Sequence, residues 1–454
     1  MLRSTLAAVL AASLSTALDA QAVWSQLYPP VQPPARSSAL MACFEATGAT
    51  IVACGEDNSV RNDVWRLQGN GWTQLPTAPF ALTDSAIVYD SVRQRLVVFG
   101  GRSAAGTLTN ATWEWDGASW IQVLVATPPS PRRAHAMAFD RARGVTVLYG
   151  GTVALVPATA MDTWEYDGTV WTQRAAVSPF GPRTSANLAF DPVRGDVMLF
   201  GGLEVLPGGG GQALFNDTWS WNGASWSQRT PTSPPTYRID PALATDLDRR
   251  RVVLHGGLFA DSFAWEWDGS EWRIALQASP SEREGGALAY DPAARRLVLF
   301  GGRNQYAPFQ DTWVYATPLP ATVEPFGSGC AGTAGTPQLQ HAPYSLPWLG
   351  DTFRNVVGAI ANGEPGALFV SSVGTTTPVP LDPFGLIGCD LLVPLDVVEF
   401  RTAAGGAAEW SVAIPISPSL AATQFRQQAF VFDAGANAFG LAASNAITAT
   451  LGVR

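Results

Sequence analysis

The chain has 454 residues, a net charge of −9 and only 14 % charged residues, while glycine, proline and tryptophan are abundant. Every basic residue is an arginine, and the absence of lysine excludes Schiff-base chemistry and a lysine general base. The acidic balance also argues against a nucleic-acid partner, because phosphate contacts need a cationic face. The length is sufficient for two or three domains with cores of their own.

Residues 1–22 have the pattern of a secretory signal peptide. An early arginine precedes an apolar stretch, and Ala20-Gln21-Ala22 matches an A-x-A cleavage site. No later apolar run is long enough to span a membrane. We therefore expect a secreted, monomeric protein (extracellular, periplasmic or at the cell surface) without membrane insertion, whose mature chain begins near Val23.

Three short phrases recur along residues 23–316. One is a strand that ends in a glycine pair, as in "LVVFGG" and "VMLFGG". The second centres on a tryptophan that usually follows Asp-Thr or Asp-Val, and its members are Trp65, Trp113, Trp164, Trp219, Trp265 and Trp313. The third has the form "WTQ" and comprises Trp72, Trp120, Trp171, Trp226 and Trp272. Self-similarity of this kind is typical of repeat architectures.

Each repeat contains four candidate strands separated by tight polar turns. In one repeat they read "AHAMAFD", "VTVLYGG", "DTWEYDG" and "VWTQR". The Asp-Gly and Asn-Gly pairs between the last two strands tolerate the positive φ of a type I′ hairpin. Four-stranded antiparallel units at this period predict an all-β fold, a β-propeller with six blades.

The double glycine, the aromatic residue before it and the following tryptophan resemble the kelch repeat over residues 23–316. The resemblance implies a kelch-type propeller similar to the central domain of the galactose oxidase group. The last repeat lacks its fourth strand, and "VWSQL" at residues 23–27 is expected to supply it. A strand from the N-terminus then closes the ring and removes its exposed edges. We expect the repeated tryptophans to be core residues.

Arginines recur at one position of the repeat, before the first strand. They are Arg36, Arg132, Arg183, Arg238 and Arg283, and Leu82 replaces them in the second blade. Strand order places them at the mouth of the central channel, on the face with the variable loops. Such a ring predicts a site for a carboxylate, sulfate or phosphate. The alternative is structural: each arginine binds carbonyls or an acid of the neighbouring blade and so locks the ring, with Asp63, Asp162, Asp217 and Asp311 as available acids.

His135, Asp240 and Glu284 stand beside the arginine position in single blades only. An imidazole and two carboxylates can perform acid–base chemistry on a sugar, so they are candidate catalytic residues, with strand capping as the alternative. The galactose oxidase group needs clustered histidines around copper, and the three histidines here are scattered. No HExxH or paired-Cys spacing indicates a metal, so we expect neither a metal nor a cofactor.

The four cysteines, Cys43, Cys54, Cys330 and Cys389, fit an oxidising compartment. Four cysteines allow three pairings, and proximity along the chain favours Cys43–Cys54 and Cys330–Cys389. The alternative for the first two is that they stay reduced and fill sites that hold aromatic residues in other repeats.

The composition changes after residue 316. We expect residues 317–325 to be a linker and residues 326–454 to form a C-terminal β-sandwich module, because apolar or alternating segments are separated by glycine and proline. Its two ends resemble a C-terminal module of exported bacterial repeat proteins, which implies no biochemical role. Trp348, Phe353 and Trp410 form either a sugar-stacking platform or part of the core.

Three functions are compatible with these features. The first is a secreted binding or interaction protein that uses the variable-loop face for a glycan or an extracellular protein partner. The second is a carbohydrate-active enzyme at the channel mouth, since the kelch-type sugar mutarotases resemble the chain in repeat and blade count. The third is a structural component of an envelope or matrix. An enzyme requires titratable groups that converge at the mouth, whereas a binding protein requires only a rigid scaffold with diverse loops.

Overall fold

The computed structural model describes residues 22–153, 158–206, 211–275, 279–317, 320–343, 345–375, 377–384, 386–415, 417 and 420–453. The predicted signal peptide lies outside these residues, apart from Ala22. The chain forms two compact units, Val23–Ala316 and Thr317–Arg454, which are taken separately below. The regular structure of both units consists of strands and one short helix among the described residues, so the fold is all-β, as predicted.

The first unit is built from six four-stranded antiparallel sheets, and five of them are made of strands that are close in the chain. The first sheet contains β2 (Leu40–Phe44), β3 (Ala49–Ala53), β4 (Val64–Gln68) and β5 (Gly71–Leu75). The second contains β7 (Ala86–Asp90), β8 (Arg95–Phe99), β10 (Thr112–Trp115) and β11 (Trp120–Val123). The third contains β12 (Ala136–Asp140), β13 (Val145–Tyr149), β14 (Thr163–Tyr166) and β15 (Trp171–Ala175).

Three further sheets follow the same plan. The fourth contains β16 (Asn187–Asp191), β17 (Asp196–Phe200), β20 (Thr218–Trp221) and β21 (Trp226–Arg229). The fifth contains β22 (Ala242–Asp246), β23 (Arg251–His255), β24 (Ala264–Trp267) and β25 (Trp272–Ala275). The sixth contains β26 (Ala287–Asp291), β27 (Arg296–Phe300), β28 (Thr312–Ala316) and β1 (Val23–Leu27). Two small pairs are β6 (Leu82–Thr83) with β9 (Arg102–Ser103), and β18 (Leu203–Val205) with β19 (Gln212–Leu214).

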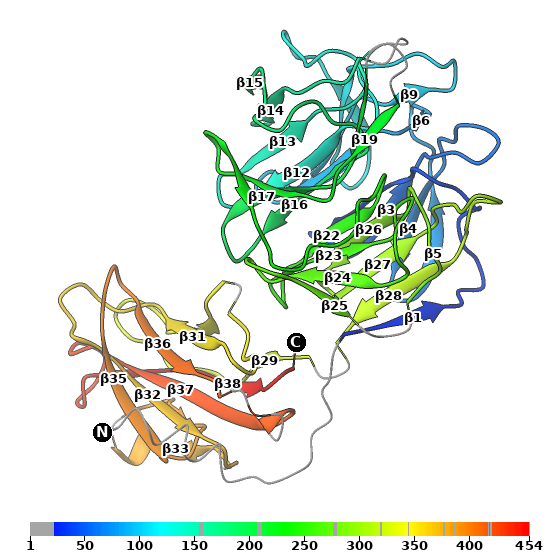
Figure 1. Ribbon diagram of the computed structural model, residues 1–454. Helices are drawn as coiled ribbons and strands as arrows, with labels where there is room; N and C mark the ends of the chain where they lie inside the picture. The colour runs from blue at the N-terminus through cyan, green and yellow to red at the C-terminus, as the bar shows by residue number, and fades with distance from the viewer. Residues whose placement is uncertain are drawn as a thin grey trace. The chain divides into compact units, whose positions relative to one another are not determined.

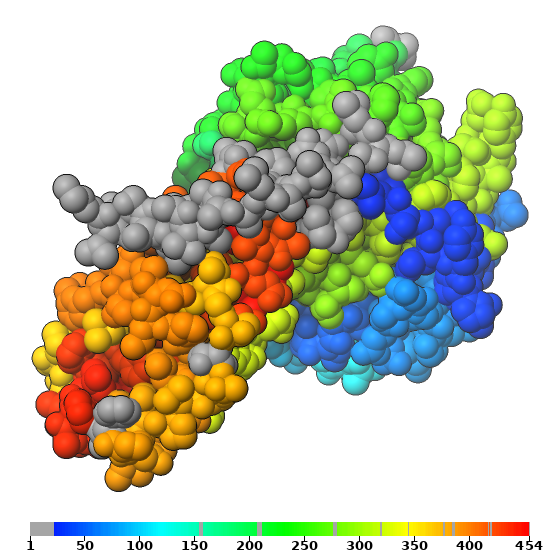
Figure 2. Space-filling view, turned by 90° about the horizontal axis from the view of Figure 1, so that it is seen from below, coloured from blue at the N-terminus to red at the C-terminus, as the bar shows by residue number. Residues whose placement is uncertain are grey.

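The first strands of the six sheets surround a common centre (Figure 1). β2 contacts β7, β7 contacts β12, and the contacts continue through β16, β22 and β26 back to β2. The N-terminal strand β1 pairs with β28, with Trp24 opposite Tyr315. In Figure 2 the blue surface of the N-terminal residues accordingly lies beside the yellow-green surface of the last strands of this unit. The first unit is therefore propeller-like.

The glycine pair after each second strand connects neighbouring sheets. Gly151 (φ +95°) donates its N–H to the carbonyl oxygen of Arg183 in the next sheet at 2.8 Å. A Cβ atom on Gly150 (φ +69°) would collide with the same oxygen. Only glycine combines the positive φ with this close approach. The equivalent hydrogen bond recurs at Gly101, Gly202, Gly257 and Gly302.

The prediction that the repeated tryptophans are core residues holds for the fourth strands except Trp120, which is half-buried. In the third strands Trp65 and Trp265 are buried, whereas Trp113, Trp164, Trp219 and Trp313 are half-buried. Four of the fourth-strand tryptophans are buried and donate the indole N–H to a threonine of the preceding sheet at 2.9–3.0 Å. These pairs are Trp72–Thr312, Trp171–Thr112, Trp226–Thr163 and Trp272–Thr218. Trp24 is buried as well, but the fifth sheet carries Ala264 at the threonine position, and Trp24 packs against His255 with ring centroids 5.2 Å apart.

The second unit contains a five-stranded and a three-stranded antiparallel sheet. The larger sheet has the order β29 (Thr322–Phe326), β38 (Leu441–Thr450), β37 (Gln424–Phe432), β32 (Gly366–Ser372) and β35 (Val397–Thr402). The smaller has the order β30 (Leu339–His341), β31 (Thr352–Val357) and β36 (Ala408–Ala413). A short pair, β33 (Val379–Pro380) and β34 (Asp390–Leu391), flanks the 3-10 helix η3 (Asp382–Phe384). β29 begins inside the segment predicted as a linker.

The core of the second unit takes apolar side chains from both sheets. Phe353 and Trp410 of the smaller sheet share one buried cluster with Phe369 and Phe425 of the larger sheet. Trp348 belongs to the same cluster and is 2 % exposed. Trp348, Phe353 and Trp410 are therefore core residues, and the sugar-stacking alternative for them is wrong.

One of the two predicted disulfides is present. Cys330 and Cys389 are bonded, with their Cα atoms 5.0 Å apart. The predicted Cys43–Cys54 bond is wrong, because both residues are free and buried. Cys43 lies opposite Thr50, four residues before Cys54, which at about 3.3 Å per residue is far beyond the roughly 7 Å that a disulfide spans.

The two free cysteines occupy different positions of the repeat. Cys43 lies in the first strand where the neighbouring sheets have Tyr89 and Phe139, so it fills an aromatic site. Cys54 follows β3 with φ +58° and takes the place of the first glycine of the pair. The alternative of reduced cysteines is thus correct, although only Cys43 replaces an aromatic residue.

Candidate functional site

The first strands of the six sheets enclose two cavities along the centre of the first unit. One set of apolar residues lines both cavities, and each member is the second residue of its strand. This set, the apolar belt, comprises Met41, Ile87, Met137, Leu188, Leu243 and Leu288. The first cavity, lined by residues at the starts of these strands, measures about 170 Å³. The second cavity, lined by residues nearer the ends of the strands, measures about 160 Å³.

A ring of residues with left-handed backbone forms the entrance to the first cavity. Each member lies two positions after the repeated arginine site and has φ between 49° and 59°. This ring, the collar, consists of Ser38, Asp84, Ala134, Ser185, Asp240 and Gly285. All of its members line the first cavity, which we call the collar chamber. The chamber opens on the face where the first strands begin, the face predicted to carry the variable loops.

The collar is held by head-to-tail backbone hydrogen bonds between neighbouring sheets. Ala134 donates its N–H to the carbonyl of Asp84 at 2.8 Å, and Ser185 donates to Ala134 at 2.8 Å. The series continues from Asp240 to Ser185, from Gly285 to Asp240 and from Ser38 to Gly285, at 2.9–3.0 Å. The donors and acceptors are backbone atoms, so these hydrogen bonds do not depend on the collar side chains, although the positive φ favours small residues at these positions.

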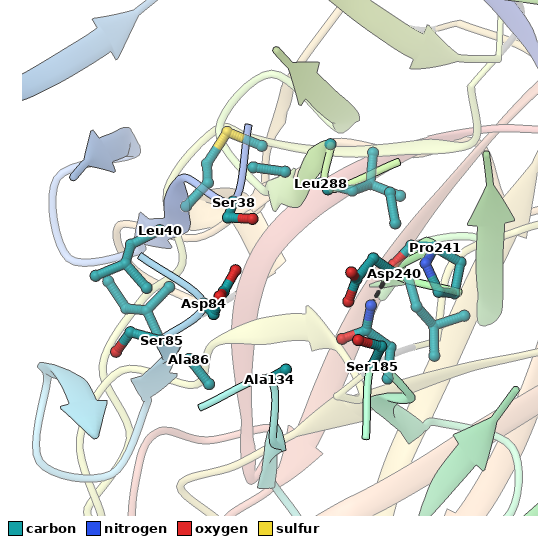
Figure 3. A pocket seen from close by; sticks show the side chains of 18 of the residues that line it. Ser38, Leu40, Asp84, Ser85, Ala86, Ala134, Ser185, Asp240, Pro241 and Leu288 are labelled. Carbon is teal, nitrogen blue, oxygen red and sulfur yellow. Dashed lines mark hydrogen bonds between the residues drawn. The ribbon is translucent and has the colours of Figure 1, made fainter. Parts of the chain in front are cut away.

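Two carboxylates face each other across the collar chamber. Asp84 belongs to the second sheet and Asp240 to the fifth, which lie opposite in the ring, and Figure 3 shows both carboxylates directed toward the middle of the pocket. Arg133 donates to the Asp84 carboxylate at 2.9 Å. Sequence reasoning found Asp240 but missed Asp84. The sequence does indicate Asp84: it stands two residues after Leu82, just as Asp240 stands two residues after Arg238.

The electrostatic environment separates these two acids. Partial burial, and next to it the negative charge of Asp84, raise the pKa of Asp240 to about 7. The charge of Glu284 raises it further, whereas a hydrogen bond with Ser185 and the charge of Arg133 oppose the shift. The Asp240 carboxyl of the chamber therefore changes its protonation state near neutral pH.

We expect Asp240 to make the protein less stable as the pH rises through neutrality. Its ordinary pKa of 3.8 applies to the unfolded chain and about 7 to the folded one, so the folded state binds more protons between these values. The free energy of unfolding should fall from about pH 4 to about pH 7 and level off above. The free energy of unfolding in urea should differ less between pH 5 and pH 8 for Asp240→Asn than for the wild type. An NMR titration midpoint of the Asp240 carboxyl near 4 would contradict this.

The other two catalytic candidates are placed differently from Asp240. Glu284 precedes the collar residue Gly285 and lies 3.9 Å from Arg303, in a partly exposed pair. His135 lines the collar chamber, but its ring packs edge-on against Phe99 with centroids 5.5 Å apart. Burial, assisted by the charge of Arg132, lowers the pKa of His135 to about 3. His135 therefore stays neutral at physiological pH and is a weak base.

The five repeated arginines are at most 1 % exposed, and each binds an aspartate of its own sheet at 2.5–2.9 Å. The pairs are Arg36–Asp63, Arg132–Asp162, Arg183–Asp217, Arg238–Asp261 and Arg283–Asp311. Each guanidinium also donates to a backbone carbonyl that follows the second strand. These contacts occupy the predicted ligand-binding groups and leave them no exposed surface for a ligand.

Three of these aspartates, Asp63, Asp162 and Asp217, have lowered pKa values and are held in the charged form by this arrangement. Burial alone would raise the pKa of Asp162, but the hydrogen bonds and charge of Arg132 outweigh it and lower that pKa, with a further contribution from Trp164. The indole N–H of Trp164 donates to the same carboxylate at 2.7 Å. In the second sheet Leu82 replaces the arginine and Ala111 stands at the aspartate position, so the two charges are absent together.

Among the described residues, no group of three or more His, Cys, Asp or Glu side chains is placed to hold a metal ion. Likewise, the part of the chain that the structure describes has no helix long and apolar enough to cross a membrane.

Comparison with known proteins adds little beyond the fold. No protein-family model and no curated protein sequence matches the chain. Among solved structures, one named "Structure of YjhT" is similar, with 14 % sequence identity and a TM-score of 0.49. The similarity covers 63 % of this chain and 95 % of that one.

Proposed function

We propose that the protein is a secreted glycan-binding protein built on a six-bladed kelch-type propeller. In this proposal residues 23–316 form the propeller, closed by the N-terminal strand, and residues 326–454 form a C-terminal β-sandwich module. Support comes from the six four-stranded sheets, whose first strands contact one another in a closed circle. The Cys330–Cys389 disulfide is compatible with an oxidising compartment such as the cell exterior.

The observation that carries the proposal is the pair of carboxylates on opposite sides of the collar chamber. A hollow of about 170 Å³ suits a small ligand or the end of a larger one. Carboxylates and hydroxyls, here Asp84, Asp240, Ser38 and Ser185, accept and donate the hydrogen bonds that sugar hydroxyls offer. The buried, paired arginines support a structural role for the arginine ring, so the ligand site moves from the arginines to the collar.

A glycan array with the mature protein tests this function. We expect the wild type to bind a defined set of glycans and the double variant Asp84→Asn/Asp240→Asn to lose most of that binding. Glu324→Gln, an exposed carboxylate of the second unit, is the matched control and should bind like the wild type. Circular dichroism establishes that the variants are folded. Wild-type protein that binds no glycan would leave an extracellular protein partner or a structural envelope role as the better explanation.

A second candidate function rests on the near-neutral pKa of Asp240. A carboxyl with a pKa of about 7, facing a second carboxyl across the chamber, is an arrangement suited to proton transfer at a sugar carbon or ring oxygen. A mutarotase or epimerase of this kind would accelerate anomeric exchange of a bound sugar. NMR exchange spectroscopy with each sugar from the array should then show acceleration by the wild type and none by Asp240→Asn. Equal rates with both proteins would leave the binding role alone.

A further inference from the structure

The fifth sheet departs from the repeat in the connection between β23 and β24. Where its counterparts have the aspartate that pairs with the repeated arginine, this sheet has Phe263. Arg238 instead binds Asp261 through a single N–H···O contact at 2.9 Å, whereas Arg132 binds Asp162 through two. The connection is therefore built differently from that of the other sheets, at the face where the collar chamber opens.

This departure leaves apolar side chains in solvent. Tyr237 is 45 % exposed, Leu258 40 %, Phe259 53 % and Phe263 39 %. The rings of Tyr237 and Phe259 meet edge-to-face, with centroids 6.0 Å apart and an interplanar angle of 67°. We call these two rings the aromatic platform. Phe259 has φ +65°, a conformation that aromatic residues rarely adopt and that concentrates at functional sites.

The aromatic platform lies next to the collar. Ile239 and Leu258 exchange backbone hydrogen bonds of 3.4 and 2.9 Å, so the segment that carries Phe259 is joined to the segment that carries Tyr237. Ile239 directly precedes Asp240, whose carboxyl group is directed into the collar chamber (Figure 3). An apolar, aromatic surface and a polar, acidic hollow therefore meet at one side of the mouth.

The charges around this mouth disfavour an anionic ligand. Asp84 and Asp240 line the chamber and Glu284 lies next to the collar. Three partly exposed arginines among the described residues near the collar already pair with acids: Arg133 with Asp84, Arg303 with Glu284 and Arg102 with Glu56. A ligand that brought its own carboxylate or sulfate would compete with these acids for the arginines and would meet the acceptors of the chamber.

We propose that the aromatic platform and the collar chamber bind one oligosaccharide of neutral or amino sugars, with its terminal ring in the chamber and the next ring on the platform. The proposal rests on the glycan-binding function above and names its ligand class and a second subsite. Sugar rings have an apolar face of C–H groups, which stacks on aromatic side chains, and a hydroxyl-rich edge, which bonds to carboxylates. The two surfaces of this mouth match these two features of one ligand.

Isothermal titration of the mature protein with defined probes tests the platform. Cellotetraose and chitosan tetrasaccharide should bind at least tenfold more weakly to Tyr237→Ala and to Phe259→Gly than to the wild type. Phe259→Gly removes the ring, and because glycine adopts a positive φ without strain, we expect this variant to fold. Phe439→Ala, an equally exposed ring of the second unit at 59 %, is the matched control and should bind as the wild type does. The monosaccharides glucose and glucosamine should bind the platform variants within about twofold of the wild type, because a single ring occupies the chamber alone.

Different results would contradict the role of the aromatic platform and the proposed glycan-binding function. If Asp84→Asn/Asp240→Asn abolishes tetrasaccharide binding while both platform variants keep wild-type affinity, glycan binding stands and the platform is overturned. If the wild type binds other glycans of the array but none of these saccharides, the proposed function stands and the ligand class named here is overturned. If it binds no glycan of the array either, both proposals fail. Tetragalacturonate that binds as tightly as cellotetraose would overturn the neutral or amino ligand class.

Discussion

Arg132→Leu is expected to lower the free energy of unfolding of the first unit by about 3–5 kcal/mol. The guanidinium is fully buried and binds the Asp162 carboxylate through two hydrogen bonds and the Gly150 carbonyl through a third. Leucine fills much of the volume but leaves these acceptors without a donor in a site that admits little water. Urea unfolding followed by tryptophan fluorescence measures the loss, since most of the tryptophans belong to the first unit.

The double variant Arg132→Leu/Asp162→Ala is the informative partner of this experiment. It reproduces the pair found in the second sheet, where Leu82 and Ala111 stand at the same positions. Removing both charges leaves no ionised group unpaired, so we expect the double variant to recover at least half of the lost stability. Additive losses from the two substitutions would contradict a structural ion pair. Unchanged stability of Arg132→Leu would reopen a ligand role for the arginines.

Reduction of the Cys330–Cys389 bond is expected to destabilise the second unit by about 4 kcal/mol, because the disulfide closes a long loop in the unfolded chain. The two cysteines are 59 residues apart in the sequence. Thermal unfolding of the whole protein with and without dithiothreitol, and of Cys330→Ser/Cys389→Ser, should show one transition moved to lower temperature. The reduced wild type and the double variant should behave alike.

The free cysteines of the first unit supply the control. Burial raises the pKa values of the Cys43 and Cys54 thiols to about 12, so both stay protonated and unreactive in the folded protein. Dithiothreitol should leave the transition of the first unit in place, and iodoacetamide should label these thiols only after unfolding. If reduction lowers the temperature of both transitions, Cys43 and Cys54 of the first unit are not free thiols as described.

The repeat made the strands of the first unit predictable. Period-2 apolar segments, Asp-Gly turns and glycine pairs are local signals, and five of the six sheets consist of strands close in the chain, so short-range patterns were sufficient for these five. The N-terminal strand could be placed because its Trp24 completes the set of fourth-strand tryptophans. The Cys43–Cys54 prediction failed because it rested on proximity along the chain, whereas Cys54 stands at the first glycine position after β3 and Cys43 lies in the first strand opposite Thr50.

The candidate site was harder to predict, because periodicity locates a residue along a strand without showing where its side chain points. The arginines do stand at the channel end of the sheets, but they turn inward to Asp162 and its counterparts. In the second sheet both the arginine and the aspartate are replaced, by Leu82 and Ala111, and this joint replacement indicates in the sequence that the two positions pair. Asp84 was missed because its repeat was treated as a defective copy of the arginine pattern. The contact of Tyr237 with Phe259 could not be read from a repeat that these residues break.

The apolar belt borders both the collar chamber and the second cavity, and each of the six sheets contributes one of its members, among them Met41 and Ile87. The chamber is therefore polar where the collar lines it and apolar where the belt does. A ligand with one hydrophilic and one hydrophobic end would fit such a chamber best in one orientation. Because the belt side chains differ from sheet to sheet, single substitutions among them can change how deeply a ligand sits without altering the hydrogen-bonded backbone of the collar.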